Sequence, residues 1–378
     1  MALGVLAFFF ALPPIEARAA AVPLLVGLLG VACGIWAVTR GQGRIAWGAV
    51  VLSALGIGLG LLATRSSTAH LGLVVSWGAL VASTLVWATP LTFAAIGGMF
   101  SERSGVVNIG LEGMMLAGAF FGVLGADKFN SWVAGLGLAA LAGGCFALLY
   151  AVFAIHLRTD QIVGGTAINL LALGATGYFF IQVYGDQGSP GNLPRIPDVT
   201  LPGRLEHVTF LGDAFGSLNL MIWLSFVLLI VAYVVMFKTP IGLRIRAAGE
   251  HPRAAETVGI SVYLLRYASV TLSGVLAALG GAYLSVGFVG SFNENMTAGR
   301  GFIALAALIF GNWRPFGAFA AALLFGASTA LSFRLATYSD SAAVLFQALP
   351  YVLTLIAVAG VIGRPVPPAS VGRPYKKQ

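Results

Sequence analysis

The stretch SGVVNIGLEGMML, residues 104–116, sets an asparagine and a glutamate among glycines and apolar side chains. It opens a long apolar run, and Glu112 lies about eight residues into that run. A carboxylate in the middle of a membrane costs about 2.5 to 3.5 kcal/mol on insertion scales, so it persists only where protein or water shelters it. The stretch therefore predicts a membrane helix whose polar side chains do not face lipid.

The composition extends this prediction to the whole chain. Of the 378 residues, 58% are hydrophobic and only 9% are charged, whereas about a quarter of a soluble domain is charged. A membrane helix needs about 20 apolar residues, and apolar runs near that length predict an all-α polytopic membrane protein with about 10–12 transmembrane helices. The predicted segments lie approximately at residues 2–13, 20–39, 45–63, 71–98, 104–126, 132–155, 162–183, 219–237, 267–290, 301–311, 317–333 and 342–362.

The basic residues indicate the orientation of these segments. The formal net charge is +8, but the basic residues are scattered between apolar runs, which does not favour a nucleic-acid partner. The loop at residues 238–266 is basic, whereas the loop at 184–219 is rich in proline, glycine and acids. The positive-inside rule places the first loop in the cytoplasm and the second outside.

The sequence contains no motif of a nucleotide-binding, metal-binding or catalytic site. A P-loop needs a lysine after a glycine, and none of the lysines, at positions 128, 238, 376 and 377, follows one. The four histidines are scattered, and the two cysteines lie in separate apolar segments. We therefore expect no catalytic residues, no metal site and no cofactor, and an integral-membrane enzyme is disfavoured.

A weak internal repeat relates NIGLEGMMLAGAF (108–120) to MTAGRGFIALAAL (296–308), with Glu112 aligned to Arg300. The predicted topology gives the two segments opposite directions, and inverted repeats are typical of transporters. The segment 301–311 is too short to cross a bilayer as a helix. The repeat places Glu112 toward the cytoplasmic half and Arg300 toward the outer half, so no salt bridge is expected between them.

Glu112 has two possible roles. It ties down an interrupted neighbouring helix, or it lines the transport path and binds substrate hydroxyls. Asn108 lies four residues earlier, on the same helical face, and is expected to bond to Glu112 or, jointly with it, to the interrupted neighbouring helix. Gly118 and Gly122 form a GxxxG pair that lets helix backbones approach closely.

The sequence GLRIRAAGEHPRAAETVGI, residues 242–260, predicts a short helix within the basic loop. Pro252 suits the first helical position and Gly259 a C-terminal stop. The alanines are expected to face the membrane, while Arg253 and Glu256 point to one side. This helix is either a docking site for a cytosolic protein or an ordinary charged loop that fixes topology.

The loop resembles the coupling segment of permeases in the ribose and branched-chain amino acid class of ABC importers. The matching residues are Gly242, Arg244, Arg246, Ala247, Gly249, Pro252, Ala254, Ala255, Gly259 and Ile260. SERSGVVNIGLEGMML (101–116) and ENMTAGRGFIALAALIFGNW (294–313) resemble signatures of the subgroup that moves nucleosides and simple sugars. The resemblance covers roughly residues 71–363. It implies extra N-terminal transmembrane segments at 1–70, a permease domain at 71–363 with a cytoplasmic coupling loop at 238–266, and a cytoplasmic tail at 364–378.

The resemblance also implies partners. In that family a permease pairs with a second permease subunit, cytosolic ABC ATPases dock on the coupling loops, and an extracytoplasmic lipoprotein delivers a small polar substrate. The chain is then a multi-pass protein of the bacterial plasma membrane, surrounded by lipid. The residues implied to couple to the ATPase are Arg246, Glu250, Pro252, Arg253, Ala254, Ala255, Glu256 and Gly259.

A nucleoside or sugar needs neutral hydrogen-bonding groups and an aromatic face more than fixed charge. On this ground, the candidates for the substrate path are Asn108, Glu112, Asn169, Phe292, Asn293, Asn295 and Thr297. A transmembrane asparagine or threonine also often bonds a neighbouring helix instead. An alternative function stays open at this point, an ion-coupled secondary transporter in which Glu112 carries a proton or sodium ion.

Overall fold

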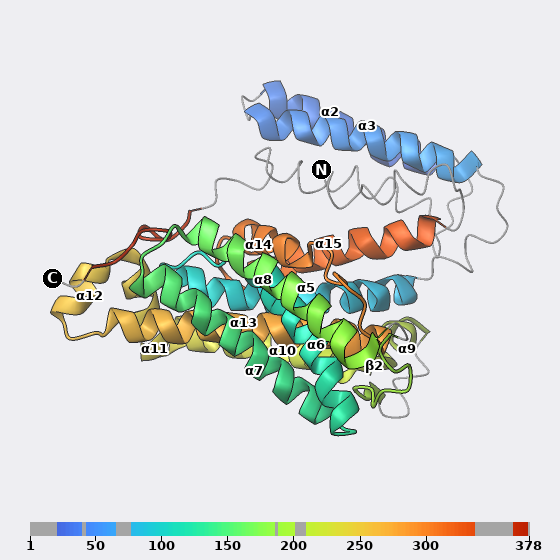
Figure 1. Cartoon of the computed structure of the whole chain (residues 1–378). Coiled ribbons are helices and arrows are strands. Elements are labelled where there is room, and N and C mark those ends of the chain that lie inside the picture. The colour runs from blue at the N-terminus through green and yellow to red at the C-terminus, as the bar shows by residue number, and fades with distance from the viewer. Residues whose placement is uncertain are drawn as a thin grey trace. The chain divides into compact units, whose positions relative to one another are not determined.

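The computed structural model describes residues 21–39, 43–65, 77–185, 188–200, 209–336 and 366–376. These residues are mostly helical, which confirms the all-α prediction (Figure 1). The predicted segments 2–13 and 342–362 lie outside the described residues. The chain divides into two compact units, and the larger one comprises residues 84–200, 217–327 and the C-terminal segment from 365.

The smaller unit contains a pair of apolar helices, α2 (Ala21–Thr39) and α3 (Gly43–Arg65). It also holds the short helix α9 (Thr209–Phe215), the start of α5 and the end of α15. Arg334 Nη2 donates to the carbonyl of Ala79 at 2.9 Å and contacts the Ser83 hydroxyl at 3.0 Å. These bonds satisfy a charged side chain at the end of an apolar helix.

The larger unit is a helix bundle. Its apolar helices, including the parts of α5 and α15 that belong to it, are α5 (Trp77–Arg103), α6 (Leu111–Lys128), α7 (Trp132–Ala151), α8 (Gln161–Tyr184), α10 (Leu220–Lys238), α13 (Val262–Ala282), α14 (Arg300–Phe310) and α15 (Pro315–Ala336). Helices α7 and α13 continue as the π-helical turns η1 (Val152–His156) and η3 (Tyr283–Val289). In the core, α6 packs on α13 so closely that a Cβ at Gly118 would lie 2.2 Å from the carbonyl oxygen of Ala278. The predicted close approach at the GxxxG pair is confirmed.

Six of the described helices are long and apolar enough to cross a membrane. Helix α14 has 11 residues, or about 16 Å at 1.5 Å per residue, so it is the short segment that the sequence predicted. The prediction of a helix from residue 104 was wrong, because residues 104–110 form turns and irregular backbone and α6 begins only at Leu111. Both members of the predicted repeat thus begin after a non-helical segment.

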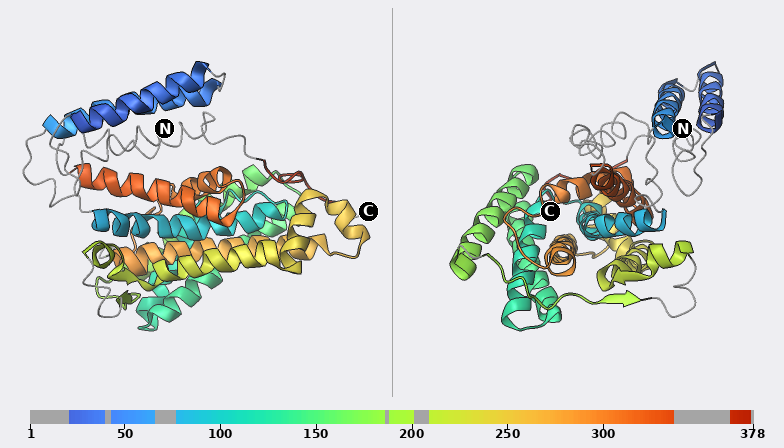
Figure 2. Two further views of the ribbon diagram at one scale, coloured as in Figure 1. Left: turned by 180° about the vertical axis from the view of Figure 1, so that it is seen from behind. Right: turned by 90° about the vertical axis from the view of Figure 1, so that its right-hand side faces the viewer.

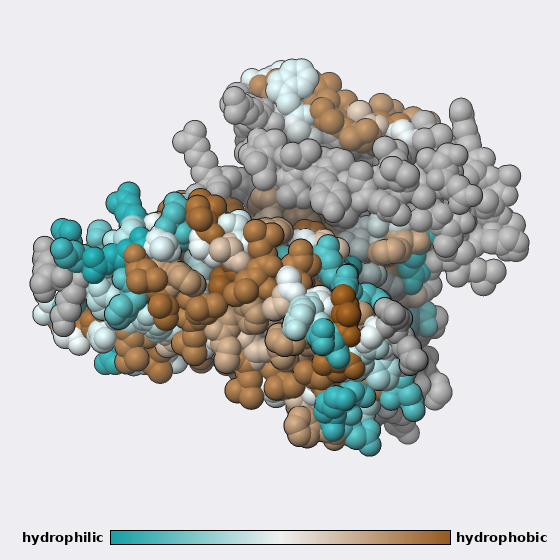
Figure 3. Space-filling view, viewed as in Figure 1, coloured by the Kyte–Doolittle hydropathy of each residue, from teal (hydrophilic) through white to brown (hydrophobic). Residues whose placement is uncertain are grey.

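The two loops predicted on opposite sides lie at opposite ends of the larger unit. One end carries α11 (Pro240–Glu250), α12 (Pro252–Thr257) and the C-terminal residues (Figures 1 and 2). The other end carries the two-stranded ribbon of β1 (Asp198–Thr200) and β2 (Ser217–Asn219), in which Asp198 pairs with Asn219. Apolar side chains gather between these ends and polar ones near α12 (Figure 3). This distribution fits a bundle that crosses a bilayer.

Candidate functional site

Glu112 holds the N-terminus of the short helix α14. The Gly299 amide donates to its Oε1 at 2.8 Å, and the Gly301 amide donates to its Oε2 at 2.5 Å. The Glu112 residue is only 8% exposed. Glu112 itself lies in the first turn of α6, so the first turns of two helices meet at this carboxylate. We call Glu112 with residues 299–301 the broken-helix junction.

The physical reason for a carboxylate at the junction is the polarity of helix ends. The first amides of a helix have no intrahelical acceptor, and the N-terminus carries a partial positive charge. Two such ends face each other here, and one carboxylate satisfies two amides of α14 while its charge stabilises both ends. The predicted tether to an interrupted helix is confirmed. The predicted separation of Glu112 from Arg300 was wrong, because the carboxylate binds the amides on either side of Arg300.

Asn108 and Asn169 both form hydrogen bonds within the protein, with partners other than Glu112. Asn108 is fully buried, and its Nδ2 donates to the Ser273 hydroxyl on α13 at 2.9 Å. The expected helical pairing of Asn108 with Glu112 was wrong because residue 108 precedes the helix. Asn169 on α8 accepts from the Gly113 amide at 2.8 Å and donates to the Ile109 carbonyl at 3.0 Å. It therefore fixes the start of α6.

The other predicted path residues lie in the loop between η3 and α14. Phe292 is 1% exposed, and its ring packs edge-on against Phe120 and Phe180 at 5.3 and 5.2 Å. Thr297 is fully buried, whereas Asn293 and Asn295 are exposed. Of these four residues, only the two asparagines have exposed side chains.

A cavity of about 240 Å³ adjoins this loop. Its aromatic wall is Trp87 of α5 and Phe288 of η3, whose rings meet edge-on at 5.2 Å. The Arg300 guanidinium lies 5.2 Å from the Trp87 ring centroid, and Asn293 adds an amide. Of the residues that line this cavity, only Asn293 was predicted from the sequence as a path residue. Trp87 gave no signal because it lies inside a long apolar helix, and its neighbours come from a distant part of the chain.

The coupling loop (residues 238–266) forms two helices where one was predicted. Helix α11 begins at Pro240 after the N-cap Thr239, and α12 begins at Pro252 as expected. Helix α12 ends at Thr257 and is followed by Gly259, which adopts φ +84°, and the amides of Gly259 and Ile260 bond back to the carbonyls of Glu256 and Ala255. This is a Schellman motif, so the predicted C-terminal stop is confirmed.

The predicted coupling residues divide by exposure. Arg253, Ala254, Glu250 and Gly259 are exposed, Pro252 and Glu256 are half-buried, and Ala255 is buried. Half-buried Arg246 lies over the ring of Phe237 at 5.0 Å. The expectation that both alanines pack inward holds for Ala255 alone. Glu256 is not free, because it accepts a hydrogen bond from the Tyr375 hydroxyl. That contact with the C-terminal residues gave no signal in the sequence.

The coupling loop is linked to α14 through the end of α5. A Cβ at Gly249, the penultimate residue of α11, would lie 2.1 Å from the carbonyl oxygen of Arg103, so the two backbones touch. Arg103 Nε donates to the Trp313 carbonyl at 3.0 Å. Trp313 Nε1 in turn donates to Glu102 Oε2 at 2.6 Å. The turn that follows α14 is thus fastened to the same end of α5 that contacts α11.

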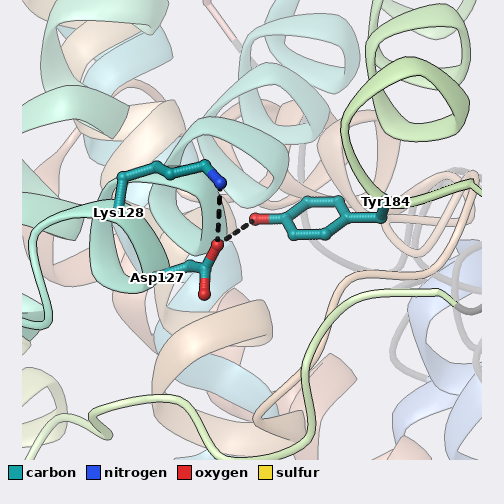
Figure 4. A network of polar contacts seen from close by, with 3 residues as sticks. All are labelled: Asp127, Lys128 and Tyr184. Atoms are coloured by element: carbon teal, nitrogen blue, oxygen red, sulfur yellow. Dashed lines mark hydrogen bonds and ion pairs between the residues drawn. The ribbon is translucent and has the colours of Figure 1, made fainter.

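The opposite end of α6 has its own polar group. Lys128 Nζ lies 3.7 Å from Asp127 Oδ2, and the Tyr184 hydroxyl donates to the same oxygen at 3.3 Å (Figure 4). Tyr184 is the last residue of α8. The group therefore joins the ends of α6 and α8 at the end of the unit predicted to face outside.

Comparisons with known proteins agree with this architecture. The family described as the branched-chain amino acid transport system permease component matches residues 80–358. The guanosine ABC transporter permease protein NupQ of Bacillus subtilis is 42% identical over 316 residues, which cover 79% of this chain and 96% of NupQ. The nucleoside ABC transporter permease protein NupC of Lactococcus lactis is 42% identical over 308 residues, with the same two coverages.

A putative glucose ABC transporter permease protein, TsgC13 of Haloferax volcanii, is 36% identical over 259 residues, which cover 68% of this chain and 77% of the relative. No solved structure matches the chain. The relatives support an ABC permease and not the ion-coupled transporter considered above. The chain is therefore a transport subunit and not an enzyme. It is a multi-pass membrane protein, which in bacteria resides in the plasma membrane. It belongs to the family of branched-chain amino acid transport system permease components.

Proposed function

We propose that this permease imports nucleosides and that separate ATPase subunits drive it through α12. The observation that carries the proposal is the form of α12, a rigidly capped helix at the polar end of the bundle with Arg253 and Ala254 exposed. A cavity of about 490 Å³ lies beside it, lined by Arg253, Glu256, Thr257 and residues 259–263. A cavity of this mixed character suits a protein partner that brings both charged and apolar side chains.

The nucleoside specificity rests on the relatives and on the cavity at Trp87. NupQ and NupC carry nucleoside names and are more similar to this chain than the glucose relative is. A nucleobase binds well to an aromatic face, which Trp87 and Phe288 supply, and the Asn293 amide offers both a donor and an acceptor. A simple sugar is the second candidate, because TsgC13 is named for glucose.

The partners are part of the same proposal. They are a second permease subunit, cytosolic ABC ATPases and an extracytoplasmic substrate-binding lipoprotein. The exposed apolar side chains of α8 and α10, such as Leu170 at 70% and Ile230 at 58%, suit lipid or a second permease. The division into residues 1–70, a permease domain at 71–363 and a tail at 364–378 also belongs to the proposal, and the family match at 80–358 supports it.

The proposed mechanism uses the contacts of α5. Movement of α12 displaces α11, and α11 presses on Arg103 through Gly249. Arg103 and Glu102 hold the turn at Trp313, so the displacement reaches α14. Because the other end of α14 is bound by Glu112, the short helix moves with α6 or tilts about the junction. Either motion changes access to the cavity at Trp87, which Arg300 of α14 lines.

The test is uptake by a reconstituted complex of this chain with its second permease, ATPases and binding protein. Replacing Arg253 by Glu reverses a charge on the exposed face of α12. We expect roughly tenfold slower guanosine uptake and loss of substrate-stimulated ATP hydrolysis, as for loss of one strong interfacial contact. The control is Lys128→Glu. It also reverses an exposed charge, but at the C-terminal end of α6, on the side of the bundle opposite α12. Normal uptake and normal stimulation in Arg253→Glu would overturn the docking assignment.

A further inference from the structure

The C-terminal residues 366–376, here called the tail segment, are bonded to the end of α11. The Ser370 amide donates to the Gly249 carbonyl at 2.9 Å, and the Ser370 hydroxyl bonds to the same oxygen. The Ala369 amide donates to Glu250 Oε2 at 3.1 Å. The last carbonyls of a helix have no intrahelical donor, so Ser370 supplies the cap that α11 lacks.

The tail segment also reaches α12. Tyr375 is 5% exposed and packs in a small apolar cluster with Ala248, Ala255 and Val262. Its hydroxyl donates to the Glu256 carboxylate on α12. Burial, and then the hydrogen bond to Glu256, raises the pKa of Tyr375 to about 12. The phenol is a donor to Glu256 at physiological pH, and the raised pKa keeps it protonated to higher pH than an ordinary tyrosine.

Arg266 anchors the tail segment to the bundle. This arginine of α13 is only 1% exposed, and a buried guanidinium requires several partners. Its Nε donates to the Ser104 carbonyl at 3.1 Å and its Nη1 to the Arg373 carbonyl at 3.4 Å. The guanidinium also lies 5.6 Å from the Tyr375 ring centroid, within cation–π range. One buried charge thus joins the tail segment, α13 and the non-helical stretch that precedes α6.

We propose that the tail segment is a positioning element for ATPase coupling, in which Tyr375 and Ser370 hold α12 and α11 at a fixed orientation to α13. Helix α12 has only six residues, and the chain on either side of it is non-helical at residues 251 and 258–261. Without the tail segment it would pivot on these ends when a partner presses on it. With Tyr375 in place, pressure on α12 moves α11 and the end of α5 as well. This inference rests on the proposed function, because it assumes that α12 receives the ATPase.

The experiment compares Tyr375→Phe and Tyr375→Ala in the same reconstituted complex. Tyr375→Phe removes the hydrogen bond to Glu256 and keeps the ring, whereas Tyr375→Ala also removes the ring contact with Arg266 and the apolar cluster. For loss of one hydrogen bond to a charged group, we expect the solute transported per ATP hydrolysed to fall about tenfold in Tyr375→Phe. We expect a larger fall in Tyr375→Ala. Lys376→Ala, at an exposed neighbouring position, is the matched control and should behave as wild type.

Hydrogen–deuterium exchange separates positioning from a general loss of structure. In Tyr375→Phe, exchange should rise at residues 252–260 and remain at the wild-type level in α6. Wild-type exchange and a wild-type transport ratio in Tyr375→Phe would overturn the inference. If Arg253→Glu uncouples transport while the Tyr375 variants do not, only the inference on the tail segment fails. If Arg253→Glu also has no effect, the proposed function fails.

Discussion

The broken-helix junction and the coupling loop each depend on one glutamate at a short helix, and the two glutamates differ in what surrounds them. Glu112 is buried, and both its oxygens accept from backbone amides of another helix. Glu256 is half-buried and accepts from a tyrosine side chain, beside an exposed Arg253. Backbone amides hold fixed positions, whereas side chains rearrange. The junction is therefore held by backbone groups, whereas the orientation of the coupling loop depends on side chains of the tail segment.

The largest effect is expected from Glu112→Ala, which removes the carboxylate that holds the broken-helix junction together. It leaves the buried amide of Gly301 and the part-buried amide of Gly299 without an acceptor, at a cost of about 1 to 3 kcal/mol for the buried amide and less for the other. Thermal unfolding of the purified protein in detergent should shift strongly downward, and uptake should be lost.

Glu112→Gln sharpens the same prediction, because its single carbonyl oxygen replaces only one of the two acceptors. Its melting temperature should fall between those of wild type and Glu112→Ala. If both variants melt as wild type does and only their selectivity among solutes changes, Glu112 lines the path and does not hold α14.

Gly301→Ala tests the close approach at the junction. A Cβ on Gly301 would lie 2.4 Å from the Glu112 nitrogen, and overpacking of this kind costs about 1 to 3 kcal/mol. The matched control is Gly174→Ala on α8, where an added Cβ meets nothing within 4 Å. We expect the control to melt at or above the wild-type temperature, since alanine favours helix. Equal melting of the two variants would show that α6 and α14 do not touch as described.

The helices of both regions could be predicted from local sequence patterns, but the contacts between them could be predicted only in part. Pro252 and Gly259 define α12 because a proline and a glycine restrict the backbone wherever they occur. Glu112 was predicted to lie away from lipid because a carboxylate within an apolar membrane segment is stable only where protein or water surrounds it. Its acceptor role toward Gly299 and Gly301 links residues 187 and 189 positions apart. The periodicity of one segment carries no information about such a pairing.

Two features escaped prediction for physical reasons that can be named. Asn108 was placed on a helical face with Glu112, but residues 104–110 leave the helix because α13 and α8 supply bonds to Asn108, Ile109 and Gly113. The tail segment reads as an ordinary charged terminus. Its order depends on buried Arg266, which lies more than a hundred residues away in sequence.

Trp313→Phe is expected to have a smaller effect. It weakens the link between the coupling loop and the broken-helix junction. It removes the donor to Glu102 and preserves most of the aromatic volume, so the loss of stability should be about 1 to 2 kcal/mol. Because Trp313 connects α14 to the end of α5, ATP hydrolysis should continue while uptake per ATP declines. A variant with a wild-type transport ratio would exclude this turn from the route between α12 and α14.

The smallest effect is expected from Asn293→Ala in the cavity at Trp87. The residue is exposed, so its replacement should leave unfolding unchanged within about 0.5 kcal/mol. Loss of one hydrogen bond to a solute should raise the KM for guanosine uptake by roughly threefold to tenfold. Asn295→Ala, in the same loop but not lining the cavity, is the control. An unchanged KM in Asn293→Ala would argue against the cavity as a contact site for the substrate.

The most direct test of the account is cross-linking of α12 to an ATPase subunit. Ala254 is exposed on α12, so Ala254→Cys can carry a short photoreactive cross-linker without disturbing a buried contact. In the assembled complex we predict a covalent product with the ATPase, whose yield changes when ATP is bound, and no such product from a cysteine at Lys128. A cross-linker at position 254 that captures no ATPase in a complex active in uptake would contradict the assignment of α12 as the coupling helix.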